Sequence, residues 1–129
     1  MACPPAGSKL LIFGGRNDEL GGTYFSDLWA FDLATRTWEE IVPAAGDAPP
    51  PRDHHGAAFS RGRMLVYGGR TGTTHDTATP LSDVWSFDWA GRVWHKELSP
   101  PEFGLHPLPR FLFSYLQYTP PNSTGEAKR

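Results

Sequence analysis

The sequence predicts an all-β protein. Its many Gly and Pro residues, its aromatic content and an internal repeat each indicate that class. Gly contributes 14 of the 129 residues and Pro 13. These residues favour turns and interrupt helices, so their frequency disfavours long helices. Eight Phe, five Trp and four Tyr supply the large apolar area that a core needs. No window shows a sustained helical period. We therefore expect short strands joined by turns, in one domain or in a part of a larger one.

A repeated segment organises the chain. Ser26–Asp32 recurs as Ser82–Asp88, 56 positions later, and Leu11–Arg16 recurs as Leu65–Arg70, 54 positions later. The difference of two residues falls in the loop between these segments. Length that varies in a loop while the flanking segments keep their register is typical of strands joined by surface loops.

Each copy is divided into strands by its turn residues. The first copy has three short apolar or alternating runs, and the second copy has the same three with one more before them. The expected strands are Lys9–Phe13, Leu28–Leu33 and Trp38–Val42 in the first copy, and His55–Ser60, Arg63–Tyr67, Val84–Trp89 and Trp94–Leu98 in the second.

The repeat carries a signature of four residue types in fixed order. A Gly-Gly pair is followed by a Phe and a Trp, with six residues between the two aromatic residues. The signature residues are Gly14, Gly15, Phe31 and Trp38 in the first copy, and Gly68, Gly69, Phe87 and Trp94 in the second. In this signature the chain resembles the kelch-repeat family, whose copies each form one four-stranded antiparallel blade of a β-propeller. The resemblance implies about two such blades.

The signature residues have structural roles in such a blade. A sharp turn after an inner strand often requires a positive φ, which only glycine adopts without a Cβ penalty. The aromatic residues would fill the layer between neighbouring blades. We therefore expect Trp38 and Trp94 both to be buried, at equivalent positions.

The repeat also sets the domain organisation. We expect an extension over residues 1–8, a partial first repeat of three strands over 9–50, a full second repeat over 51–100, and a tail over 101–129. In the tail, Pro109–Arg110 follows Pro51–Arg52 by 58 positions, as the first strand of a third repeat would, and the end of the tail is expected to be disordered. Two blades form an incomplete ring, because a closed propeller typically needs about 4–8. The chain is therefore expected to be a piece of a longer protein, or copies of it associate through the exposed flanks of the blades.

Composition disfavours several functions. A net charge of −2 leaves no excess of positive charge that would attract nucleic acid. No run approaches the roughly 18 apolar residues of a membrane span, and the first residues lack the features of a secretory signal. The one cysteine, Cys3, cannot form an internal disulfide. These features favour a cytoplasmic location.

No catalytic, cofactor or metal site is expected. His54 and His55 adjoin Asp53, but neighbouring residues of a strand point to opposite faces and do not easily bind one ion. His75 and Asp76 have no third ligand nearby in the sequence. The nucleophile elbow, the phosphate-binding loop and the dinucleotide fingerprint are all missing from the sequence.

The remaining functional prediction is a protein-binding surface on one rim of the blades. Two loops of variable length, Arg16–Phe25 and Arg70–Leu81, open with an arginine directly after Gly-Gly, and the repeat places both on the same rim. The guanidinium group suits carboxylates on a partner protein. The alternative is that both arginines only pair with acidic neighbours in their own blades. The candidate contact residues are Arg16, Asn17, Asp18, Tyr24, Arg70 and His75.

The resemblance implies a non-catalytic scaffold or adaptor that binds a protein partner through its propeller loops. The alternative is a fragment of a propeller enzyme of the galactose-oxidase type. That enzyme class carries copper and a cofactor made from crosslinked Cys and Tyr, whereas Cys3 lies outside the repeats of this chain.

Overall fold

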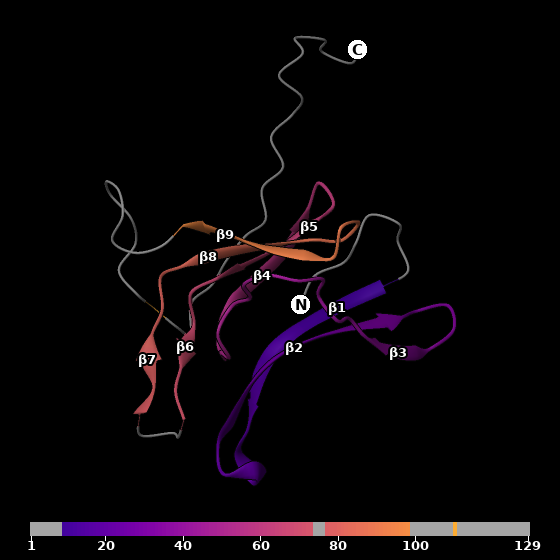
Figure 1. Ribbon diagram of the computed structural model, residues 1–129. Coiled ribbons are helices and arrows are strands. Elements are labelled where there is room, and N and C mark those ends of the chain that lie inside the picture. The colour runs from indigo at the N-terminus through magenta and orange to yellow at the C-terminus, as the bar shows by residue number, and fades with distance from the viewer. Residues whose placement is uncertain (1–8, 74–76, 99–109, 111–129) are drawn as a thin grey trace, which may run out of the picture.

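The computed structural model describes residues 9–73, 77–98 and 110, and these residues form an all-β structure with antiparallel pairing throughout (Figure 1). A three-stranded sheet in the order β1-β2-β3, the first blade, packs against a four-stranded sheet in the order β4-β5-β8-β9, the second blade. A two-stranded sheet of β6 and β7 extends from the second blade. The strands are β1 (Lys9–Asn17), β2 (Thr23–Asp32), β3 (Thr37–Glu40), β4 (Gly56–Ser60), β5 (Arg63–Tyr67), β6 (Arg70–Thr71), β7 (Thr79–Pro80), β8 (Val84–Asp88) and β9 (Val93–Leu98).

The second blade follows the predicted strands closely, because β5 has the predicted bounds and β4, β8 and β9 each differ by one residue at one end. In the first blade, β3 begins one residue earlier and ends two residues earlier than expected. The blades do not close a ring within the described residues.

The prediction of a loop over Arg16–Phe25 was wrong. β1 continues through Gly14 and Gly15 to Asn17, and it still pairs with β2 beyond a register shift between Phe13 and Gly15. Both glycines have positive φ, at 62° and 106°, so the chain takes up the irregularity as a bulge and continues as a hairpin.

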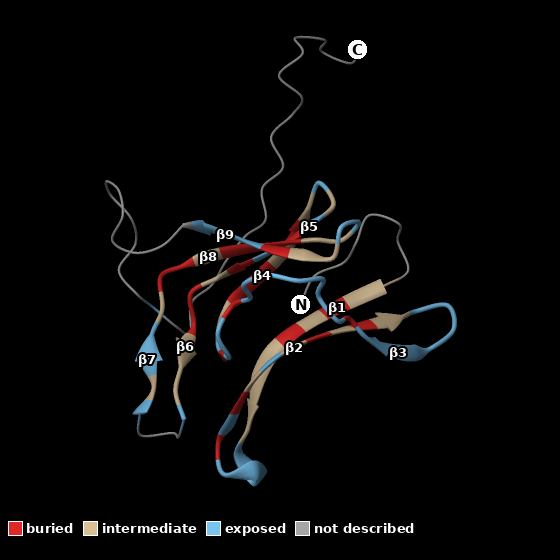
Figure 2. Ribbon diagram, viewed as in Figure 1, coloured by how far each residue is buried: buried red, intermediate tan, exposed pale blue. Residues whose placement is uncertain are grey.

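The main core lies between the two blades. The first blade contributes Leu11, Phe13, Leu28 and Ala30 from one face, and Ile41 lies beside them. The second blade contributes Ala57, Phe59, Met64, Val66, Trp85, Phe87 and Trp94. In Figure 2 both sheets contain buried segments, whereas β3 is exposed along its length.

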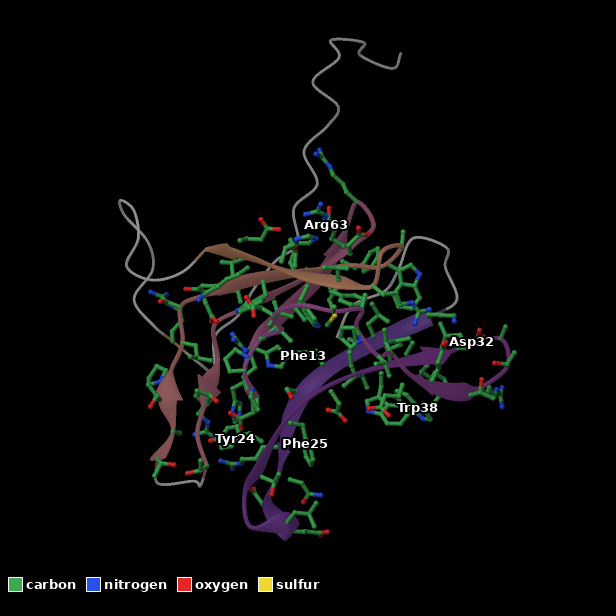
Figure 3. All side chains as sticks on the ribbon, viewed as in Figure 1. Phe13, Tyr24, Phe25, Asp32, Trp38 and Arg63 are labelled. Atoms are coloured by element: carbon green, nitrogen blue, oxygen red, sulfur yellow. The ribbon has the colours of Figure 1, made fainter. Side chains whose placement is uncertain are left out.

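The expectation that Trp38 is buried was wrong. Trp94 is 5% exposed and packs between Phe87 of its own blade and Phe13 of the first blade, with ring centroids 5.1 and 5.0 Å away. Trp38 packs in the same way on Phe31, at 4.9 Å, but it is 53% exposed. Its side chain lies on the side of the first blade that faces away from the second blade, and no described residue covers it (Figure 3).

A buried arginine joins the two blades. The backbone of Arg52 is held by the first blade, because its carbonyl accepts from Gly15 N at 2.8 Å and its N–H donates to Phe25 O at 3.1 Å. Its guanidinium enters the second blade, where it donates to both carboxylate oxygens of Asp83 at 2.8 Å and to the carbonyl of Gly68 at 3.0 Å. Arg52 is fully buried. Arg52 therefore ties the first blade to the second, because the first blade holds its backbone and the second blade binds its side chain.

The contacts of Arg52 explain why position 14 is a glycine and why Asp83 is ionised. A Cβ on Gly14 would lie 2.7 Å from the carbonyl oxygen of Arg52, so a side chain there would push the next blade away. Burial by itself would raise the pKa of Asp83, but the hydrogen bonds and positive charge of Arg52 lower it below the usual aspartate value. Asp83 is thus held as a carboxylate.

A second joint begins at the end of the described chain. Arg110 N donates to Leu81 O at 3.0 Å, and Arg110 O accepts from Gly69 N at 2.9 Å. Gly69 and Leu81 stand at the repeat positions of Gly15 and Phe25, which bind the backbone of Arg52 in the same way. Arg110 thus lies where the arginine of a third repeat would lie.

Candidate binding rim

Two hairpins project from the same end of the blades, and together they form the candidate binding rim (Figure 1). One is the distal part of β1 and β2 with the 3-10 turn Asp18–Leu20 at its tip. The other is formed by β6 and β7. Paired strands therefore occur within both segments that were expected to be loops, Arg16–Phe25 and Arg70–Leu81.

Local hydrogen bonds shape the first tip. The side chain of Asn17 accepts from Glu19 N at 2.9 Å, which caps the turn, and Gly21 ends the turn with a φ of 71°. The hydroxyl of Thr23 donates to Leu20 O at 2.6 Å and closes the hairpin. These bonds hold Glu19 and Leu20 out in solvent, where Leu20 is 61% exposed.

Asp53 lies at the base of the rim and links the two hairpins. Arg70 donates to its two carboxylate oxygens, from Nε at 2.8 Å and from a terminal nitrogen at 3.2 Å. Arg16 Nε of the first blade lies 3.7 Å from the same carboxylate, and His54 Nδ1 lies 3.1 Å from it. Asp53 is 6% exposed, so this cluster is a largely desolvated ion-pair network between the blades.

The contacts within this cluster shift the pKa values of Asp53 and Arg70 toward their charged forms. Burial would raise the pKa of Asp53, but the hydrogen bonds from Arg70 and His54 outweigh it and lower the pKa below the usual aspartate value. The same hydrogen bond from Arg70 to Asp53 raises the pKa of Arg70. Asp53 is therefore ionised near neutral pH and paired with the rim arginines.

The predicted contact residues occupy different depths of the rim. The side chains of Arg16 and Arg70 are only 11% and 12% exposed, and both lie at Asp53. Acidic neighbours therefore pair with both arginines, but the pair of Arg16 with Asp53 joins the two blades and is not confined to one blade as the alternative had it. Tyr24 is buried, with its ring 5.7 Å from the guanidinium carbon of Arg16. Asp18, in contrast, is 74% exposed while it pairs with Arg16 at 2.8 Å.

Two further predicted residues differ from this group. Asn17 is half-buried and serves as the cap described above, and His75 lies outside the described residues. Sequence reasoning did not single out Leu20, and the sequence holds no signal for it, because single exposed apolar side chains are common on protein surfaces.

His55 lies behind the rim, in the joint between the blades. Its ring meets Phe13 edge to face, with centroids 5.6 Å apart. Burial, with a further contribution from the charge of Arg52, lowers the pKa of His55 to about 4. The strand was expected to begin at His55, but β4 begins only at Gly56, and His54 has a φ of 54°. The two rings thus belong to different environments, one at Asp53 and one in the core.

In residues 9–73, 77–98 and 110, no group of three or more His, Cys, Asp or Glu side chains is placed to hold a metal ion. The same residues include no helix long and apolar enough to cross a membrane.

The comparison with family models decides the identity of the fold. The model of the KLHDC2/KLHL20/DRC7 Kelch-repeats domain matches residues 1–117. The chain belongs to the kelch-repeat family. The Gly-Gly turns, the stacked Phe–Trp pairs and the Arg52 joint are thus the parts of two kelch blades.

Similar kelch proteins occur in distant organisms. The chain is 35% identical over 106 residues to dynein regulatory complex subunit 7 of Chlamydomonas reinhardtii, an alignment that covers 81% of this chain and 8% of that protein. It is 39% identical over 79 residues to Kelch repeat-containing protein 2 of Saccharomyces cerevisiae, which covers 57% and 8%. It is 29% identical over 121 residues to Kelch domain-containing protein 1 of Mus musculus, which covers 79% and 29%. The chain thus spans less than a third of the length of each of these relatives.

Proposed function

We propose that these kelch blades act as a non-catalytic protein-interaction module, with the exposed tip of the β1–β2 hairpin as a contact for a partner protein. The observation that carries the proposal is the position of Leu20, an apolar side chain 61% exposed on a tip that hydrogen bonds hold in one shape. A rigid scaffold that presents a loop tip is the usual way in which repeat proteins bind.

Charge divides the rim into a base and a contact layer. Arg16 and Arg70 are held at Asp53, so they serve as the base. Asp18, Glu19 and Leu20 form the layer that a partner would meet first. A partner with a basic or amide-rich surface around an apolar pocket fits this layer, since the acidic side chains would surround the buried leucine.

The names of relatives agree with this class of function. Dynein regulatory complex subunit 7 is by its name a component of a complex, and host cell factor 1 of Mus musculus, 40% identical over 62 residues and 48% of this chain, is another similar protein. Neither name describes a reaction, which favours a binding role for this chain over a catalytic one.

A photo-crosslinking experiment tests the contact. A photoreactive phenylalanine analogue replaces Leu20 in the chain expressed in cells, and Leu33 is the matched control, because it is 54% exposed in the β2–β3 turn at the opposite end of the first blade. We expect position 20 to crosslink a distinct protein that position 33 does not, and Leu20→Asp to reduce its recovery. The same crosslinks from both positions, or none from position 20, would contradict the proposal.

A further inference from the structure

Two consecutive residues, Arg52 and Asp53, lie between the two rim hairpins and bond to both through their backbone. The backbone of Arg52 bonds to Gly15 and Phe25 of the β1–β2 hairpin. Asp53 forms an isolated bridge with the first residue of β6, in which its N–H donates to Arg70 O at 3.1 Å and its carbonyl accepts from Arg70 N at 3.0 Å. The backbone of one dipeptide therefore sets the distance between the hairpins.

The side chain of Asp53 links the same hairpins a second time. Its carboxylate accepts two hydrogen bonds from Arg70 of β6, and Arg16 of β1 lies 3.7 Å from it. Arg16 also pairs with Asp18 at the hairpin tip, at 2.8 Å. A line of alternating charges thus runs from the exposed tip of one hairpin to the base of the other. Because Asp53 is buried, salt and water screen the inner part of this line only weakly.

Close packing leaves the linking dipeptide little room to shift. A Cβ on Gly69 would lie 2.5 Å from the carbonyl oxygen of Asp53 and 2.9 Å from the Cβ of His55. Figure 3 shows the buried Tyr24 on the side of its hairpin where β6 lies, and Arg70 of β6 interacts electrostatically with it. Packing therefore limits the movement of one hairpin against the other.

The second hairpin presents an uncharged surface beside the acidic tip. Both residues of β7, Thr79 and Pro80, are exposed. Nearer the end of the hairpin, Thr73 N donates to the hydroxyl oxygen of Thr77 at 3.2 Å. Pro80 has no N–H, which disfavours the addition of a partner strand to β7. A contact with this hairpin is therefore made by side chains.

We propose that Asp53 is a positioning residue that holds the two hairpins as one rigid surface, and that the partner which contacts Leu20 also contacts Thr79 and Pro80. The shared contact rests on the proposed function. A spacing fixed before binding avoids the cost of ordering the hairpins, and a second linked contact strengthens the first. The partner then has a basic or amide-rich pocket for the tip and an uncharged surface next to it for β7.

A distance measurement between two nitroxide labels tests the role of Asp53 without a partner. The labels are attached to cysteines that replace Leu20 and Thr79, in a chain with Cys3→Ser so that no other thiol is labelled. We expect one narrow distance distribution. Asp53→Asn should broaden and shift it, because the guanidinium groups of Arg16 and Arg70 would then face each other without their shared counter-charge.

Two controls separate positioning from general stability. Asp47→Asn makes the same chemical change at an exposed residue outside the cluster, and Met64→Ala weakens the core at the end of β5 remote from the rim. Both should keep the narrow distribution. If Asp53→Asn does not fold, Arg16→Gln removes only the side chain that reaches Asp53 from the first hairpin and should also broaden the distribution. A distribution that stays narrow in the folded variant would overturn the role of Asp53.

Photo-crosslinking tests the shared contact. The photoreactive phenylalanine analogue used at position 20 also replaces Thr79, and we expect both positions to capture the same protein. Asp53→Asn should lower its recovery from position 20 about fivefold or more, the lower end of couplings between linked sites, whereas Met64→Ala should not. A protein captured from position 20 and not from position 79 would overturn the shared contact and leave the proposed function standing. No capture from position 20 would contradict the proposed function and the shared contact, while the label distances still decide the role of Asp53.

Discussion

The two blades have the same aromatic pair at the same register and differ in what lies next to it. Phe31 pairs with Trp38 across β2 and β3, and Phe87 pairs with Trp94 across β8 and β9. The geometry within each pair is nearly the same, but only Trp94 has a neighbouring blade against it. A kelch blade thus fixes the position of its tryptophan, whereas the adjacent blade fixes its burial.

The largest expected effect is on the tryptophans themselves. Trp94→Ala should lower the free energy of unfolding by about 4 kcal/mol, because it empties a packed site between two aromatic rings. Trp38→Ala should lower it by about 1 kcal/mol or less, because that side chain is already half in solvent. Urea unfolding at low protein concentration measures both. Equal losses would show that the adjacent blade does not decide the difference.

The same comparison applies to the paired aspartates. Asp83→Asn should cost about 3 kcal/mol of folding free energy, because Arg52 would stay buried without its counter-charge. Asp27→Asn should change the free energy by less than about 0.5 kcal/mol, since Asn can still accept from Trp29. Chemical unfolding of the two variants gives the difference directly, and a large loss for Asp27→Asn would reveal a basic partner inside the monomer.

A smaller effect should appear on acidification, through the histidine between the blades. The folded pKa of His55 is about 4 and its unfolded value is 6.5, so the unfolded chain binds the additional proton between these limits. Stability should therefore fall as the pH drops through this window, by about 2 kcal/mol between pH 7 and pH 5.

Replacement of the histidine isolates this contribution. Urea midpoints at pH 7 and pH 5 for the original chain and for His55→Gln provide the measurement. The variant should lose most of the pH dependence, since the lowered pKa values of Asp53 and Asp83 place their titration below this window. A slope that persists in the variant would place its origin in another group.

The last comparison concerns the second glycine of each Gly-Gly pair. Gly15 has a φ of 106° with open space where a Cβ would lie, so Gly15→Ala should cost about 1–3 kcal/mol from backbone strain alone. In Gly69→Ala, the Cβ would also lie 2.5 Å from the carbonyl oxygen of Asp53 and should cost clearly more. Thermal melts rank the two variants, and the reverse order would contradict the contact assigned to Gly69.

Local sequence determined the strands and turns of this protein. The repeat located every strand of the two blades. It could do so because alternating apolar residues favour strands and Gly or Pro favours turns, and both preferences are set by residues close together in the sequence. It also predicted that a third repeat starts at Arg110, and this stays a prediction, although the backbone hydrogen bonds of Arg110 match those of Arg52. It missed the extension of β1 and β2 past the Gly-Gly pair, since the pairing of Asn17 with Thr23 depends on how a bulge resolves in three dimensions.

Tertiary structure decided which of these repeated residues are buried and which are paired. The sequence presents Trp38 and Trp94, or Asp27 and Asp83, as equivalents, because the repeat is visible in the chain and the neighbouring blade is not. Likewise, Arg16 and Arg70 look like two separate loop arginines, and only the packing of the blades brings both to Asp53. The physical reason is that burial and ion pairing are properties of the contact between blades, and one copy of a repeat does not contain that contact.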